Sequence, residues 1–125
     1  MTNTPSKPCS NKHNGHKIYM AFPYWHKSPA AQNELIYEAK KAAARLIKEG
    51  YQVYSPLSHK LAVENSGVSL NKESWKRIHR EFIIWADEFW VFQIAGPAES
   101  PEFPLELEMA FSELKIVKYF KFVLL

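Results

Sequence analysis

The chain has 125 residues, of which 46% are hydrophobic, so it can bury one core but is too short for two ordinary domains. Its net charge of +3, from 16 basic and 13 acidic residues, is too small to predict a nucleic-acid-binding surface. A single cysteine excludes an internal disulfide, and no apolar run reaches the roughly 20 residues of a membrane-spanning helix, so we expect a cytoplasmic protein without a membrane partner.

Residues 1–16 have almost no large apolar side chains and contain two prolines, so they cannot bury enough surface to offset the entropy of ordering. We expect a flexible tail at 1–16, followed by one domain at 17–125. Cys9, His13 and His16 have a spacing that could hold a metal, but no fourth ligand lies near them in the sequence. We therefore expect no metal site.

The first half of the domain has the pattern of a strand, a helix and a second strand. Residues 17–22, KIYMAF, are apolar and rich in strand-forming side chains. Apolar residues then recur at helical spacing from Ser28, the predicted N-terminal cap, to Gly50, the predicted C-terminal cap. Residues 51–57, YQVYSPL, are predicted to form a strand that Pro56 stops. This order favours a right-handed crossover between two parallel strands.

The second half continues the alternation after a loop that we expect at 60–72. Apolar residues line one face of a predicted helix at 75–85, and 88–94 is a nearly continuous apolar strand of the kind buried on both sides. The stretch 99–111, ESPEFPLELEMAF, contains the start of another helix. The last segment, 115–125, is predicted to be a buried strand.

This alternation predicts an α/β fold, a three-layer sandwich with a flavodoxin-like or Rossmann-like open parallel sheet of four to five strands and helices on both faces. In such sheets, ligands bind beyond the carboxyl ends of the strands, where the strand order reverses. The chain has four glycines and none of the glycine-rich motifs of dinucleotide or triphosphate sites. We therefore expect a different kind of small-molecule site at this edge.

Polar and aromatic residues follow the first three predicted strands, which predicts the lining of a small-molecule pocket. The alternative is that loops are polar in any case. The candidate substrate-binding residues are Ala21, Pro23, Tyr24, Trp25 and His26 after or at the end of the first strand, Ser58 and His59 after the second, and Gly96, Glu99, Ser100 and Glu102 after the third.

Five sequence features lie in a fixed order along residues 17–120. They are IYMAFPYWH, a long Ala-rich helix, GYQVYSPLSH, a Trp and an Asp separated by eleven residues, and the pattern G-x2-ES-x5-E-x3-A. In order and spacing they resemble the nucleoside 2-deoxyribosyltransferase superfamily, and they look closest to an uncharacterised bacterial and phage branch of it. No single motif is specific, and the resemblance depends on their combination.

The resemblance implies an enzyme that cleaves or transfers the N-glycosidic bond of a nucleoside or nucleoside 5′-monophosphate, with no cofactor. In this superfamily a glutamate of the last helix attacks the sugar's anomeric carbon and expels the base, and water or another base then resolves the glycosyl ester. The matching residue is Glu106. A helix N-terminus stabilises a carboxylate as the anion, which suits a nucleophile, although first-turn glutamates are also common on surfaces. Glu108, about 200° further around the helix, is expected to face solvent.

Other roles follow from the same resemblance. Tyr19 matches a tyrosine that positions the nucleophile, with core packing as the alternative. His79 lies where relatives carry an acid that assists the departing base, and a histidine can serve as general acid. Ser100 and Glu99 match the sugar or phosphate end, whereas Glu102 replaces a glycine of the family's anion-binding turn.

The changes at positions 79 and 102 leave a second hypothesis open, namely a non-catalytic nucleotide-binding protein of the same fold. A third hypothesis is a protein-interaction module that uses the aromatic side chains of Trp75, Trp85 and Trp90. We also expect a homodimer or higher homo-oligomer, because apolar positions near the second and third helices exceed what one small core needs. Asp87, which matches a family aspartate, is expected to order its loop.

Overall fold

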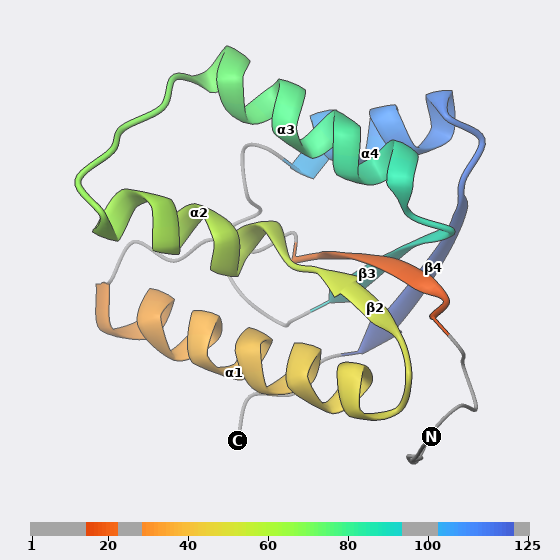
Figure 1. Cartoon of the computed structure of the whole chain (residues 1–125), viewed down its shortest axis with the longest axis horizontal. Helices are drawn as coiled ribbons and strands as arrows, with labels where there is room; N and C mark the ends of the chain where they lie inside the picture. Colours follow the sequence, from red (N-terminus) through yellow and green to blue (C-terminus); the bar gives the residue numbers. More distant parts are fainter. Residues whose placement is uncertain (1–14, 23–28, 94–102, 122–125) are drawn as a thin grey trace, which may run out of the picture.

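The computed structural model describes residues 15–22, 29–93 and 103–121, and in this part of the chain four parallel strands form one sheet between helices (Figure 1). The strands are β1 (Lys17–Ala21), β2 (Gln52–Tyr54), β3 (Glu88–Gln93) and β4 (Ile116–Lys121), in the order β2-β1-β3-β4. The helices are α1 (Pro29–Lys48), α2 (Pro56–Asn65), α3 (Lys72–Trp85) and α4 (Phe103–Ser112). The predicted α/β fold with an open parallel sheet is confirmed.

The direction of each crossover decides which face of the sheet its helix covers. The chain moves one way along the sheet from β1 to β2, and the opposite way from β2 to β3 and from β3 to β4. Because such crossovers are right-handed, opposite directions place helices on opposite faces. Figure 1 accordingly shows α1 on one side of the sheet and α3 and α4 together on the other. The strand order reverses between β1 and β3, whose carboxyl ends are therefore neighbours.

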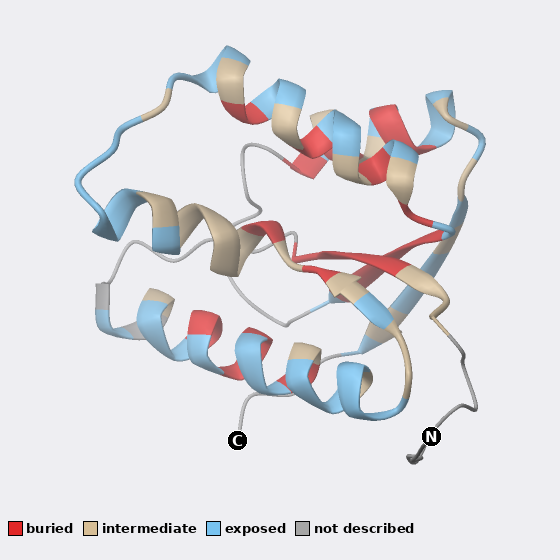
Figure 2. Ribbon diagram, viewed as in Figure 1, coloured by how far each residue is buried: buried red, intermediate tan, exposed pale blue. Residues whose placement is uncertain are grey.

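Each face of the sheet carries its own apolar core, and Figure 2 shows the buried residues concentrated in the central strands β1 and β3. On the α1 face, Leu35 and Ala39 pack with Ile18, Met20 and Trp90. On the α3 and α4 face, Ile83 and Met109 pack with Tyr19, Phe89 and Val91. Because successive strand residues point to opposite faces, β1 and β3 supply both cores at once.

Helix α2 was not predicted, since 51–57 was expected to be a strand and 60–72 a loop. The structure instead ends β2 at Tyr54 and begins α2 at Pro56. Ser55 is extended at the N-terminal cap, and a proline is favourable at the first helical position because its missing N–H needs no partner there. We did not predict this helix because its apolar residues do not recur at helical spacing. The helix buries only Pro56, so it needs no apolar face.

Strand β4 was predicted to be buried, and this is wrong. It lies at the edge of the sheet, where Val117 and Phe120 reach the two cores while Tyr119 is 52% exposed. An edge strand has a neighbour on one side only, so apolar composition did not imply burial. Lys118 and Lys121 lie on this strand, and charged side chains disfavour pairing with another sheet edge.

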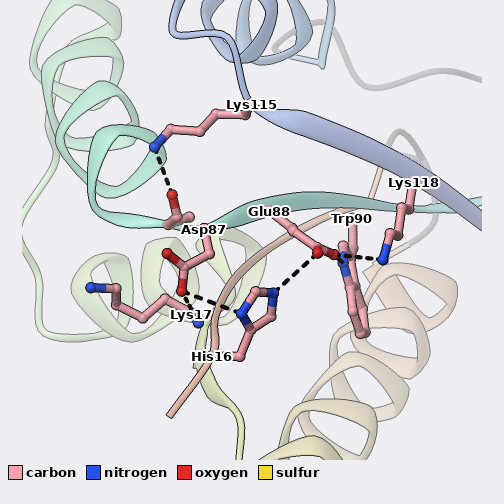
Figure 3. Close-up of polar contacts among 8 residues, drawn as sticks. His16, Lys17, Asp87, Glu88, Trp90, Lys115 and Lys118 are labelled. Atoms are coloured by element: carbon pink, nitrogen blue, oxygen red, sulfur yellow. Dashed lines mark hydrogen bonds and ion pairs between the residues drawn. The ribbon is translucent and has the colours of Figure 1, made fainter. Parts of the chain in front are cut away.

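A polar network ties β1 to β3 at the amino-terminal edge of the sheet (Figure 3). The Lys17 backbone N–H donates to Asp87 Oδ2 at 2.8 Å, and the Asp87 N–H donates to the Lys17 carbonyl at 2.7 Å. Asp87 thus orders the start of β3, as expected. Gly15 and His16, placed in the tail by their sequence, also belong to this edge, because the Gln52 N–H donates to the His16 carbonyl at 2.9 Å.

Glu88 is the buried carboxylate of this network. It accepts a hydrogen bond from Trp90 Nε1 at 2.7 Å and lies 3.0 Å from Lys118 Nζ and 3.1 Å from His16 Nε2 (Figure 3). Burial by itself would raise the pKa of this carboxyl, but the hydrogen bonds from Trp90, Lys118 and His16 outweigh burial and hold the pKa below its usual value.

Among the described helices, none is long and apolar enough to cross a membrane.

We predict that Glu88→Gln lowers the free energy of unfolding near pH 7 by about 1 to 2 kcal/mol, because the amide keeps the Trp90 bond and loses the charge. The folded-state pKa lies below the unfolded-state value of 4.5, so this stabilisation is present above pH 4.5 and is lost as the pH falls through the folded-state pKa. Urea unfolding at several pH values measures the difference. A difference that persists unchanged in acid contradicts the assignment, and Glu64→Gln on the exposed surface of α2 is the control.

Candidate active site

Tyr19 lies at the centre of the α3 and α4 face and is completely buried. Its ring stacks on Phe89 of β3, with centroids 5.0 Å apart and planes inclined by 11°. On the other side Tyr54 of β2 packs against it with a centroid distance of 5.4 Å. Held between two neighbouring strands, the Tyr19 ring has one direction in which to present its hydroxyl.

That hydroxyl donates a hydrogen bond to Glu106 Oε2 at 2.5 Å. Glu106 lies in the first turn of α4 and is only 5% exposed, whereas Glu108, as expected, faces solvent. A carboxylate is costly to bury unless it is hydrogen-bonded, and a bond to a charged acceptor is among the stronger ones. Glu106 is therefore not the surface glutamate that a first helical turn often carries.

His79 of α3 is 3% exposed and lines the same pocket as Glu106. Its ring stacks on Trp75 one turn earlier, with centroids 5.8 Å apart. The pocket lies between α3 and α4 and encloses about 20 Å³, which is room for about one water molecule. Its other lining residues are Lys72, Trp75, Lys76, Leu105 and Met109.

Tyr54 forms a second layer next to Tyr19 that the sequence did not reveal. Its hydroxyl is hydrogen-bonded to His59 Nδ1 at 3.0 Å, and its ring stacks on Phe82 with centroids 3.8 Å apart. Burial and, second, the negative charge of Glu106 raise the pKa of Tyr54 above its usual value, so the hydroxyl keeps its proton at neutral pH. Tyr54 pairs in register with Tyr19 in the neighbouring strand, and strand alternation could have placed both on one face.

The remaining predicted residues divide into three groups. Ser58 and His59 line a separate open groove of about 500 Å³ at the outer edge of β2, which they share with Lys40 and Phe82. Ala21 is fully buried in the core beside α4. The other predicted substrate-binding residues lie outside the described part of the chain: Pro23, Tyr24, Trp25, His26, Gly96, Glu99, Ser100 and Glu102.

The structure thus brings together Tyr19, His79 and Glu106, the three residues predicted to be catalytic. Ser58 and His59 line the other groove, and His59 reaches the cluster only through its contacts with Tyr54 and Trp75. Sequence reasoning also missed Lys72 and Lys76 of the pocket, although their helical spacing relative to Trp75 and His79 would have placed them on the same side of α3. Among the residues that the structure describes, no group of three or more His, Cys, Asp or Glu side chains could hold a metal ion.

Comparisons with known proteins agree with this architecture. Residues 16–121 match the family model described as a domain of unknown function, DUF1937. The solved structure of a 2-deoxyribosyltransferase from the psychrotolerant bacterium Bacillus psychrosaccharolyticus has the same fold, with a TM-score of 0.54 over 84% of this chain and 72% of that chain, at 22% sequence identity. The fold implied by the resemblance is thereby confirmed. No curated protein matches the sequence significantly.

We predict that Tyr19 and Glu106 are energetically coupled. A double-mutant cycle of Tyr19→Phe and Glu106→Gln should give a coupling free energy of about 1.5 to 3 kcal/mol, the range for hydrogen bonds to charged groups. Urea unfolding of the four proteins near neutral pH measures it. Tyr119→Phe, combined with the same Glu106 substitution, is the matched control, because Tyr119 is half exposed on β4 and should show no coupling. Purely additive effects of Tyr19→Phe and Glu106→Gln would contradict a bond that holds the carboxylate.

Proposed function

We propose that this chain, which belongs to the DUF1937 family, is an enzyme that cleaves or transfers the N-glycosidic bond of a nucleoside or nucleoside 5′-monophosphate, most simply a 2′-deoxy one. The observation that carries the proposal is the Glu106 carboxylate, buried at the start of α4 and held by the Tyr19 hydroxyl at 2.5 Å. The fold shared with a 2-deoxyribosyltransferase supports the same chemistry.

Glu106 acts as the nucleophile in two steps. In the first step a carboxylate oxygen forms a bond to C1′ of the sugar, while the bond from C1′ to the base nitrogen breaks and its electron pair leaves with the base. In the second step water or another base attacks C1′ and releases the carboxylate. Because Tyr19 binds Oε2, it fixes the orientation of the carboxylate throughout, and its hydroxyl stabilises the charge that returns to Glu106 when the ester is cleaved.

His79 supplies the proton that the departing base needs. It lines the same pocket as Glu106, and the stacked Trp75 ring orients it. A base that leaves protonated is a better leaving group than its anion, and a positioned general acid contributes about 10²- to 10⁴-fold. No metal or redox group takes part in this scheme.

The pocket between α3 and α4 is too small for a whole nucleoside, since it encloses about 20 Å³. In this proposal only C1′ of the sugar and the base nitrogen bonded to it approach Glu106. The rest of the base and sugar lies beyond the carboxyl edge of the sheet, where the strand order reverses between β1 and β3. The residues predicted to bind them, among them Tyr24, Trp25, His26 and Ser100, belong to segments that follow these two strands in the sequence.

Of the two alternatives, the interaction module has the weaker support, because Trp75 and Trp90 are 3% and 8% exposed and Trp85 is partly buried. A non-catalytic nucleotide-binding protein remains the competing function. We also propose that the protein is cytoplasmic, that it self-associates, and that its small-molecule partner is a nucleoside or nucleotide.

The test is release of free base from a panel of ribonucleosides, 2′-deoxynucleosides and their 5′-monophosphates, measured by chromatography. We expect Glu106→Ala to lower kcat by about 10⁴-fold or more, and His79→Phe to lower it by about 10²- to 10⁴-fold. Glu108→Ala, on the exposed side of the same helix, should leave kcat unchanged. Acid quenching during turnover, followed by mass spectrometry, should find a pentosyl adduct on the peptide that contains Glu106.

Base release that continues undiminished in Glu106→Ala would falsify the assignment of the nucleophile. A nucleotide that raises the melting temperature of the wild type without being consumed would instead support the binding protein.

A further inference from the structure

The pocket beside Glu106 has a row of hydrogen-bonding side chains along its α3 wall. Lys72, Trp75, Lys76 and His79 line it and lie on one face of α3, because residues three, four and seven positions apart share a face of a helix. Helix α3 ends next to the start of β3, so its first turns lie toward the carboxyl edge of the sheet (Figure 1). The row therefore lies on the side from which the proposed substrate approaches.

Trp75 supplies a donor that the described fold does not use. The side chain is 3% exposed, and its Nε1 is buried without a hydrogen-bond partner among the described residues. A buried indole N–H ordinarily has a partner, since leaving it unpaired is costly. Packing against His79 requires only the ring, which stacks on the imidazole. The unpaired N–H in the wall of a pocket indicates a ligand that accepts a hydrogen bond.

Two ammonium groups flank Trp75 at the rim of the pocket. Lys72 and Lys76 are exposed, and neither forms an ion pair within the described part of the chain. A third ammonium group, that of Lys60 in α2, lies 5.9 Å from the centre of the Trp75 ring. An ammonium group or an indole N–H can donate a hydrogen bond but cannot accept one. Apart from the proposed nucleophile and acid, the polar side chains described in this lining therefore suit a substrate group that only accepts.

We propose that these donors bind the carbonyl oxygen O2 of a pyrimidine, and that the chain therefore acts on 2-oxopyrimidine nucleosides or nucleotides. This inference rests on the proposed function and specifies its substrate. In a pyrimidine nucleoside the glycosidic nitrogen is N1, and the neighbouring ring carbon carries O2. A substrate that places C1′ against Glu106 thus brings O2 close to the pocket, whose enclosed space of about 20 Å³ holds one oxygen-sized atom.

A purine has a different outline at the same place. Its glycosidic nitrogen is flanked by a C–H on one side and by the fused six-membered ring on the other. The ring nitrogen that could accept a hydrogen bond belongs to the edge of that ring, which is wider than a space for one atom. A purine therefore leaves the Trp75 N–H unpaired, and a site built to form a hydrogen bond rejects a ligand that cannot complete it.

The same contacts favour departure of the base. When the bond between C1′ and N1 breaks, its electron pair goes to the base, and the negative charge is shared between N1 and O2. Donors at O2 therefore bind the departing base more strongly than the intact nucleoside, which lowers the barrier. His79 then delivers the proton that neutralises this charge.

The test compares three 2′-deoxynucleosides and their 5′-monophosphates. 2′-Deoxyuridine and 2′-deoxycytidine share the 2-oxo group, whereas 2′-deoxyinosine carries its oxo group elsewhere. We expect kcat/KM for the two pyrimidines to exceed that for 2′-deoxyinosine by about 10²-fold or more. Trp75→Phe, which keeps an aromatic ring, and Lys76→Met should each lower kcat/KM for the pyrimidines by about 10-fold or more. Both variants should change the value for 2′-deoxyinosine by less than about 2-fold.

A control variant and a binding measurement accompany the assay. Lys41→Met, on the exposed side of α1 across the sheet, should leave all values unchanged. Calorimetric titration with free uracil, cytosine and hypoxanthine probes the same site without turnover. The two pyrimidines should bind at least about 10-fold more tightly than hypoxanthine, and Trp75→Phe should remove this difference. If no substrate releases its base, the proposed function fails, and the titrations still decide whether the donors select a pyrimidine.

Three results overturn the inference. One is 2′-deoxyinosine handled as well as the pyrimidines, or hypoxanthine bound as tightly as uracil. Another is an equal loss for all substrates in Trp75→Phe and Lys76→Met, which is what a purely structural role predicts. The third is a loss confined to the 5′-monophosphates, which would assign the lysines to the phosphate instead of the base.

Discussion

The hydrogen bond between Tyr19 and Glu106 joins the central strand β1 to helix α4, and the arrangement of the candidate site depends on it. A carboxylate that is 5% exposed requires a strong donor, and Tyr19 can supply one only because Phe89 and Tyr54 fix its ring from both sides. The stacking in the sheet therefore determines where the carboxylate lies. In the proposed reaction this rigidity is useful, because a nucleophile that is already oriented loses little freedom in the transition state.

Crossover handedness brings the rest of the site to the same place. His79 and Glu106 lie on different helices, and they line one pocket because both helices follow crossovers that run in the same direction along the sheet. The two edges of the sheet also differ in chemistry. The amino-terminal edge is closed by the Glu88 and Asp87 network, which stabilises the fold. The carboxylate and the histidine lie on the face of the sheet that α3 and α4 cover, where Tyr19 holds Glu106.

Local patterns predicted most of the elements, and their failures have physical causes. Helices α1 and α3 were found because each buries one apolar face, and β1 and β3 because both of their faces are buried. Helix α2 buries only Pro56, so it has no periodic signal, and Pro56 was taken as a stop where it is a start. The apolar composition of β4 suggested burial, but its position at the sheet edge exposes Tyr119 and Ile116. Leu114, which follows α4, has a positive φ of 58°, and the sequence gives no sign of it, because a leucine after a helix is ordinary until its φ is known.

The sequence by itself determined the alternation of strands and helices apart from α2, the fold class and, through the resemblance, the choice of Tyr19, His79 and Glu106 as candidates. These depend on residue types and on spacing along the chain. Only the tertiary structure decided that Glu106 is buried, that Tyr19 reaches a residue 87 positions away, and that His59 lines another groove than His79. Contacts of this kind form between segments that are distant in sequence. Which residues meet depends on which helices cover each face of the sheet, and a local sequence pattern does not contain that information.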